Sequence, residues 1–189
     1  MKLMRNPIRL VPSLFAFAIA IGTVLLSLPI ATADGIRAPF LTALFTATSA
    51  VAVTGLVVVD TGTYWSPFGQ AAILLMFQIG GLGIMTAATL FGLIAGRGFG
   101  LHDRMATQVE RGRLERGDAL SVLKLVFAIT IVVEVVVAAI LALRMASAYD
   151  MGLGTALWHG VFHSVSAFNN AGFSTHADSV MGYQSDPII

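Results

Sequence analysis

Four side chains in this apolar sequence could take part in chemistry. His159 and His163 are four residues apart and would share one face of a helix, which is the spacing of a two-histidine zinc site with Asp150 as a third ligand. Glu134 lies in the middle of an apolar run, where a carboxylate is a candidate functional group. These residues predict either a zinc-dependent membrane enzyme or two structural roles: a histidine that contacts nearby backbone, and a glutamate hydrogen-bonded between helices.

Residues 49–58, SAVAVTGLVV, indicate a second kind of chemistry, the coordination of a cation by backbone carbonyl groups. The run is uncharged, with Gly55 near its middle, and it follows a short predicted helix from Arg37 to Ser49. Non-helical backbone at membrane depth survives only inside protein or beside a watery cavity. There its carbonyl groups can replace the hydration shell of an ion, and a glycine lets the backbone approach that ion. The alternative is a re-entrant loop that only packs.

The composition requires a lipid environment. Hydrophobic residues make up 57% of the chain and charged residues 11%, whereas soluble domains carry about a quarter charged residues. The mean hydropathy is +0.85. The absence of cysteine excludes disulfides and thiolate metal sites, and a net charge of +1 gives no reason to expect a nucleic-acid partner. We therefore expect an all-α membrane protein that is surrounded by the lipid bilayer and binds no cofactor.

Three apolar runs are long enough to cross a membrane, which takes roughly 20 residues. They are Leu10–Ala33, Ser66–Gly96 and Ala119–Leu143. The second begins with Ser66-Pro67, a typical N-cap and first-turn pair. The first is too long for the hydrophobic region of a cleaved signal peptide and has no clear cleavage motif, so a membrane span is the favoured interpretation.

Small residues inside the second run predict close packing. Gly80, Gly81 and Gly83 lie in an apolar segment with no neighbouring strand, which excludes a phosphate-binding loop. Small residues at such spacing let helices approach one another. We therefore expect a packing contact at this point of the helix.

The distribution of Lys and Arg predicts the orientation in the membrane. Of the 11 such residues, only Arg37 and Arg144 lie on the side opposite the N-terminus. The others are Lys2, Arg5, Arg9, Arg97, Arg104, Arg111, Arg113, Arg116 and Lys124. Because positive residues collect on the cytoplasmic side, we expect a multi-pass plasma-membrane protein with a cytoplasmic N-terminus. The outer acids, which would concentrate cations or act as ordinary solvated charges, are Asp34, Asp60, Asp150, Asp178 and Asp186.

The two segments on the outer side resemble each other. A shift of 117 residues aligns Phe45 with Phe162, Ser49 with Ser166, Ala50 with Ala167 and Gly55 with Gly172. The order span, short helix, glycine-centred strand, span therefore recurs, which indicates an internal repeat. We expect a first repeat at 1–97, a cytoplasmic linker at 98–118, and a second repeat at 119–189. The second repeat stops before its last helix, so we expect the chain to be the N-terminal part of a longer protein.

Two stretches carry a resemblance to a known family. Residues 46–86, TATSAVAVTGLVVVDTGTYWSPFGQAAILLMFQIGGLGIMT, resemble the first pore loop and following helix of the Ktr/Trk/HKT potassium transporters, and most closely the bacterial Ktr membrane subunit. Residues 162–179, FHSVSAFNNAGFSTHADS, are similar to the second pore loop of that family. The resemblance implies four span–pore–span units around one ion path, of which this chain would carry about one and a half.

The resemblance also implies an ion-transporting role and no catalysis. Its potassium-coordinating backbone would map to Val53, Thr54, Gly55, Asn170, Ala171 and Gly172. Glycine at position 55 favours potassium, because serine there accompanies sodium transport in the plant branch of the family. Sodium as a coupling or activating ion stays open. The implied assembly is a membrane homodimer on a cytosolic ring of nucleotide-binding regulatory subunits.

Two alternatives predict different molecules. One is a complete cation channel subunit with two pore loops per chain that assembles as a dimer. The other is the membrane metalloenzyme that uses His159 and His163, with Asp150 or Glu134 as a further ligand.

Overall fold

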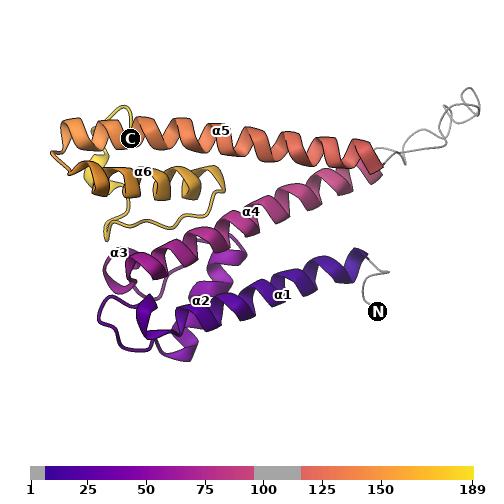
Figure 1. Cartoon of the computed structure of the whole chain (residues 1–189), viewed down its shortest axis with the longest axis horizontal. Coiled ribbons are helices and arrows are strands. Elements are labelled where there is room, and N and C mark those ends of the chain that lie inside the picture. The colour runs from indigo at the N-terminus through magenta and orange to yellow at the C-terminus, as the bar shows by residue number, and fades with distance from the viewer. Residues whose placement is uncertain (1–6, 96–115) are drawn as a thin grey trace, which may run out of the picture.

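The structure, a computed structural model, describes residues 7–95 and 116–189, and the side chains of 11–86 and 124–189 (Figure 1). Within these ranges every regular element is helical, apart from one isolated bridge between Thr32 and Trp65, which agrees with the predicted all-α class. In chain order the elements are α1 (Pro7–Leu26), η2 (Pro29–Ala31), α2 (Phe40–Val51), α3 (Thr61–Tyr64), α4 (Pro67–Ala95), α5 (Arg116–Ala148), α6 (Leu153–Phe168) and η4 (Met181–Tyr183).

Two helices are long and apolar enough to cross a membrane, judged by length and composition over the described side chains. They are Pro67–Thr86 within α4 and Lys124–Ala148 within α5. Val11–Leu26 of α1 and Phe40–Val51, the whole of α2, are shorter apolar helices. The second and third predicted spans therefore correspond to α4 and α5.

The first predicted span is shorter than expected at its C-terminal end. Its helix ends at Leu26 and not at Ala33. Leu28 is extended, with φ −74° and ψ 143°, because Pro29 follows it and the residue before a proline is driven out of the helical region. The apolar run continues past the helix, so hydropathy alone placed the boundary too late.

The predicted linker lies almost wholly outside the described residues. Only its last three positions, 116–118, are described, and they form the start of α5. Lys2, Arg5 and the arginines from Arg97 to Arg113, on which the predicted orientation mainly depends, also lie outside the described residues.

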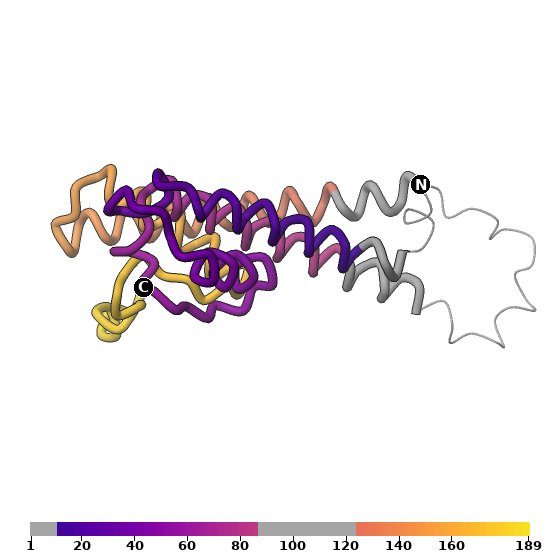
Figure 2. Tube along the Cα trace, turned by 90° about the horizontal axis from the view of Figure 1, so that it is seen from below, coloured from indigo at the N-terminus to yellow at the C-terminus, as the bar shows by residue number. Residues whose placement is uncertain are grey.

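The long helices run lengthwise through the molecule (Figures 1 and 2). The start of α1, the end of α4 and the start of α5 lie at one end, whereas α2, α3 and α6 lie toward the other. The helix α6 packs along α5, and α2 packs against α1 and α4. The segments that follow α2 and α6 therefore begin at short helices that pack against the longer ones.

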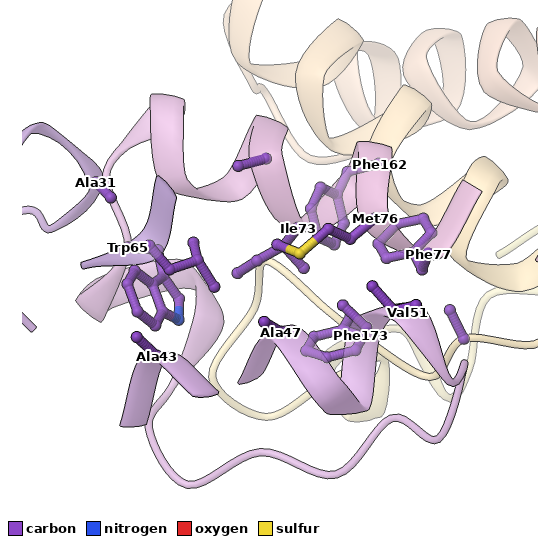
Figure 3. Close-up of a cluster of buried hydrophobic side chains, with 14 of the residues drawn as sticks. Ala31, Ala43, Ala47, Val51, Trp65, Ile73, Met76, Phe77, Phe162 and Phe173 are labelled. Carbon is purple, nitrogen blue, oxygen red and sulfur yellow. The ribbon is translucent and has the colours of Figure 1, made fainter. Parts of the chain in front are cut away.

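A buried apolar cluster joins the N-terminal helices to the second half of the chain. Phe77 of α4 makes an edge-to-face contact with Phe162 of α6, with ring centroids 5.6 Å apart. Phe77 also stacks on Phe173, which follows α6, at 6.0 Å. Figure 3 shows these rings with Val51 at the end of α2. Because each fully buried aromatic side chain contributes about 1.5–3 kcal/mol, this cluster ties the segments after α2 and α6 to the same helix.

Candidate functional site

The first candidate loop, residues 52–56, leaves the end of α2 by a short hydrogen-bonded turn. The Val53 N–H donates to the carbonyl oxygen of Ala50 at 3.1 Å, and the Thr54 N–H donates to that of Ser49 at 2.9 Å. The Thr54 hydroxyl also donates to the Ser49 hydroxyl at 2.9 Å. These bonds occupy the carbonyl groups of Ser49 and Ala50 in the last turn of α2, which have no partner within the helix.

The second candidate loop, residues 169–173, leaves α6 by the same turn. The Asn170 N–H donates to the carbonyl oxygen of Ala167 at 3.0 Å, and the Ala171 N–H donates to that of Ser166 at 2.7 Å. Each donor and acceptor is 117 residues from its counterpart in the first loop, which is the shift that aligns the two sequences. The Ser166 hydroxyl adds a bond to the carbonyl oxygen of Phe173 at 2.7 Å.

Neither loop forms the β-strand that the sequence predicted. The sign of φ alternates along each loop: φ is positive at Val53 (56°) and Gly55 (72°), and again at Asn170 (56°) and Gly172 (73°). In a strand successive carbonyl groups point to opposite sides, whereas an alternating sign of φ can turn successive carbonyl groups toward one side. A β-branched residue at positive φ is strained and is a mark of functional sites, at a cost of about 1–3 kcal/mol.

The two loops meet at their glycines. A Cβ atom on Gly55 would lie 2.5 Å from the carbonyl oxygen of Ala171 and 3.1 Å from Cα of Gly172. A Cβ atom on Gly172 would lie 3.3 Å from Cα of Gly55. Two of the residues that the sequence singled out, 117 positions apart, are therefore neighbours, and only glycine fits at that contact.

The glycine pair of α4 supports both loops. A Cβ atom on Gly80 would overlap the carbonyl oxygen of Val51, just before the first loop, and one on Gly81 would overlap the side-chain amide oxygen of Asn169, at the start of the second. The sequence predicted close packing at this point between helices. The contact of Gly80 is with Val51, the last residue of α2, so the prediction is confirmed there, and Gly81 adds a contact with Asn169, the C-cap of α6.

A buried polar network holds the entrance of the second loop. The Gln78 amide donates to one carboxylate oxygen of Glu134 at 3.0 Å, and the Asn169 amide donates to the other at 3.2 Å. The Asn169 amide also donates to the Gln78 amide oxygen at 2.6 Å. Glu134 is 5% exposed and Asn169 4%. Of the two readings of Glu134, the hydrogen-bonded one describes its contacts, because the carboxylate joins α4, α5 and the end of α6.

Sequence reasoning missed Gln78 and Asn169 as partners of Glu134. Gln78, like Glu134, is a polar residue in the middle of an apolar helix. That shared position was the available sequence signal that the two side chains pair. Asn169 is the C-cap of α6, where its N–H bonds the carbonyl oxygen of Val165. Its place against Glu134 comes from the way α5 and α6 pack, since the Ser164 hydroxyl also bonds the Glu134 carbonyl oxygen at 2.8 Å.

The two predicted zinc ligands of α6 find a different third neighbour. His159 and His163 form a group with His176, and their ligand atoms all lie within 4.8 Å of one another. Asp150 is not in this group. His163 makes the backbone contact that the sequence suggested, with its Nδ1 2.8 Å from the carbonyl oxygen of His159. Burial lowers the pKa of His176, while Asp178 acts in the opposite direction.

Two of the five acids expected on the outer side, Asp60 and Asp186, have structural partners. Asp60 caps α3 by accepting bonds from the Thr63 N–H at 2.7 Å and from its hydroxyl. Asp186 forms an ion pair with Arg144 at 2.9 Å. A hydrogen bond from the Ile188 N–H and the Arg144 contact hold the pKa of Asp186 below its usual value. Asp60 is therefore a helix cap, and Asp186, whose side chain is 2% exposed, is a buried partner of Arg144, so neither is an isolated solvated charge.

The chain belongs to a family of cation transport proteins. The model of the TrkH family, described as cation transport protein, matches residues 15–189, which is most of the chain. The family consists of transporters and not of enzymes, so the metalloenzyme alternative is wrong.

Three relatives illustrate the membership. The chain is 44% identical over 175 residues to the Ktr system potassium uptake protein B of Bacillus subtilis, covering 93% of this chain and 38% of the relative. It is 35% identical to the protein of the same name from Vibrio alginolyticus, covering 89% and 36%. It is 33% identical to the potassium/sodium uptake protein NtpJ of Enterococcus hirae, covering 96% and 40%. The chain thus spans about two fifths of the length of these relatives.

Proposed function

We propose that the protein carries potassium ions across the plasma membrane along a path lined by backbone carbonyl groups of residues 52–56 and 169–173. The observation that carries this proposal is the alternation of φ in both loops together with the meeting of Gly55 and Gly172. Carbonyl groups turned to one side can replace the water of a dehydrated cation, and their neutral dipoles release it again. The coordinating backbone in this proposal is that of Val53, Thr54 and Gly55 and of Asn170, Ala171 and Gly172.

The helices that precede the loops support the same role. Both α2 and α6 end where the loops begin, so each directs the negative end of its dipole toward them. A cation is stabilised by such an end, and an anion is not. The absence of ionised side chains from either loop is consistent with weak, rapid binding of a monovalent ion.

The architecture around the path is part of the proposal. Residues 1–97 and 119–189 would be successive span–pore units joined by a cytoplasmic linker at 98–118, with the N-terminus in the cytoplasm. Two further units would complete a four-loop ring in the full-length protein, which would form a homodimer on a cytosolic nucleotide-binding ring. Sequencing of the whole gene tests the number of loops. A full-length protein with only these two loops would contradict the four-loop ring.

Ion flux tests the function. The full-length protein, produced in a bacterium that lacks its own potassium uptake, is expected to restore growth at low potassium and to take up potassium in preference to sodium. A preference for sodium would overturn the proposal. A second candidate, potassium uptake that depends on sodium, is favoured by the relative from Enterococcus hirae, whose name includes both ions. Uptake measured with and without external sodium separates the two.

A further inference from the structure

Three imidazole rings gather beside the second loop, on residues that the proposed ion path does not use. His159 and His163 lie one turn apart on α6, and His176 comes from the segment after the loop. The ring of His176 stacks on that of His159, with centroids 4.4 Å apart, and on that of His163 at 5.0 Å. One ring nitrogen from each residue lies within 4.8 Å of the other two.

His163 is held in a tautomer that suits a metal ligand. Its Nδ1 is 2.8 Å from the carbonyl oxygen of His159, which can only accept, so Nδ1 carries the proton. The lone pair of the neutral ring is therefore on Nε2, which lies 2.9 Å from the Ser174 hydroxyl. Metal-binding histidines commonly donate their second ring N–H to a backbone carbonyl group in this way, which holds the ring and its tautomer.

The ring nitrogens of the other two histidines form hydrogen bonds to hydroxyl groups. His159 Nδ1 lies 2.5 Å from the Thr175 hydroxyl, and His176 Nε2 lies 3.2 Å from the Tyr183 hydroxyl. A hydroxyl group can rotate away when a stronger partner arrives. Negative charge is also close, because Asp178 acts electrostatically on His176.

We propose that His159, His163 and His176 form a binding site for a divalent transition-metal ion such as Zn²⁺, with water as a fourth ligand. Imidazole nitrogen suits Zn²⁺, and three histidines with an open fourth position are a known arrangement for that ion. Tetrahedral ligation brings the nitrogen atoms to about 3.3 Å from one another. His176 must turn to reach this geometry, because its ring is nearly parallel to the other two and a metal lies in the plane of each ligating imidazole.

Metal binding acts on the second loop through this movement. The helix α6 holds His159 and His163, whereas His176 is joined to Gly172 by only three residues. Turning His176 and displacing the hydroxyl groups of Ser174 and Thr175 shifts the chain directly after the loop. Bound Zn²⁺ therefore slows ion passage. This effect rests on the proposed function, but the binding of the metal does not.

A direct binding measurement tests the site. The full-length protein, purified with an affinity tag that contains no histidine, is titrated with Zn²⁺ in competition with a chromophoric chelator. We expect one Zn²⁺ per chain at this site and a loss of affinity of at least about tenfold in His176→Ala and in His159→Ala, since even the hydrogen-bond partners of metal ligands affect affinity 10–100-fold. The matched control is His102→Ala, the fourth histidine of the chain, which keeps the wild-type affinity.

The outcomes separate the site from the function. Equal Zn²⁺ affinity in wild type, His176→Ala and His159→Ala would overturn the site. If His159→Ala, which lies in a packed helix, does not fold, His176→Ala decides alone, because its ring is carried by a non-helical segment. Zn²⁺ is expected to slow potassium uptake by the wild type and by His102→Ala severalfold, and to leave His176→Ala unaffected. Binding without this inhibition would overturn the coupling to the loop, whereas absence of any uptake would contradict the proposed function and leave the binding result intact.

Discussion

The two loops have the same backbone but different supports. In the first, the side-chain bonds are local: Thr54 bonds Ser49, five residues earlier in the same unit. In the second, the entrance residue Asn169 is held by Gln78 of α4 and Glu134 of α5. The difference teaches that the side-chain hydrogen bonds that hold one backbone conformation can come from the preceding helix or from distant parts of the chain. Substitutions in the two loops should therefore have unequal effects.

Gly55→Ala is expected to have the largest effect. The added Cβ would lie 2.5 Å from the carbonyl oxygen of Ala171, at a φ of +72° that costs an L-residue roughly 1–2 kcal/mol. With about 1–3 kcal/mol more for the overlap, we expect potassium uptake to fall more than about 30-fold. Uptake per molecule in the membrane, quantified by immunoblot, measures this. Near-normal uptake would remove Gly55 from the ion path.

Glu134→Ala should come next, because it breaks the support that only the second loop has. The Gln78 amide loses its buried acceptor, and such an unpaired group costs about 1–3 kcal/mol, whereas the Asn169 amide keeps its bonds to Gln78 and Val165. We expect about a tenfold loss of uptake and a lower melting temperature of the purified protein. Glu134→Gln, which keeps one acceptor oxygen, should recover part of both. If Glu134→Ala behaves as wild type in both measurements, the second loop does not depend on the network.

Gly172→Ser tests whether Gly172 has the same role in the ion path as Gly55. Its Cβ would meet only Cα of Gly55, at 3.3 Å, so the strain comes mainly from a φ of +73°. At roughly 1–2 kcal/mol, we expect a severalfold loss of potassium affinity or selectivity with normal membrane insertion. The dependence of uptake on potassium concentration, with sodium as a competitor, measures this loss. Unchanged kinetics at normal expression would place Gly172 outside the ion path.

Thr54→Val should have the smallest effect. It removes the hydroxyl bonds to Ser49 but keeps the backbone bond of Thr54 and its volume. A hydrogen bond of a partly exposed group is worth about 0.5 kcal/mol, the lower end of the usual range, so we expect about a twofold change in uptake. The same assay as for Gly55→Ala provides the comparison. A loss as large as that of Gly55→Ala would mean that the Thr54 side chain, and not the backbone, binds the ion.

Local sequence signals predicted the helices where a local cause acts. Ser66-Pro67 begins α4 as expected, with the Ser66 hydroxyl accepting the Gly69 N–H at 3.2 Å. Pro29 also indicated that α1 ends before it, because the residue before a proline is driven out of the helical region. The boundary was placed too late because the apolar run continues past Leu26. The strand expected around Gly55 was wrong, since β-branched residues favour extended backbone and nothing local indicates positive φ at Val53.

The sequence by itself determined that the chain is helical and apolar, and it marked Gly55 and Gly172 through the 117-residue shift that aligns their segments. Only the tertiary structure decided which residues meet. The bond between Gln78 and Glu134, like the approach of His176 to His159, joins different elements. Spacing within one helix indicates which side chains share a face, but a contact between elements depends on how they pack, and packing is set by the whole set of buried side chains.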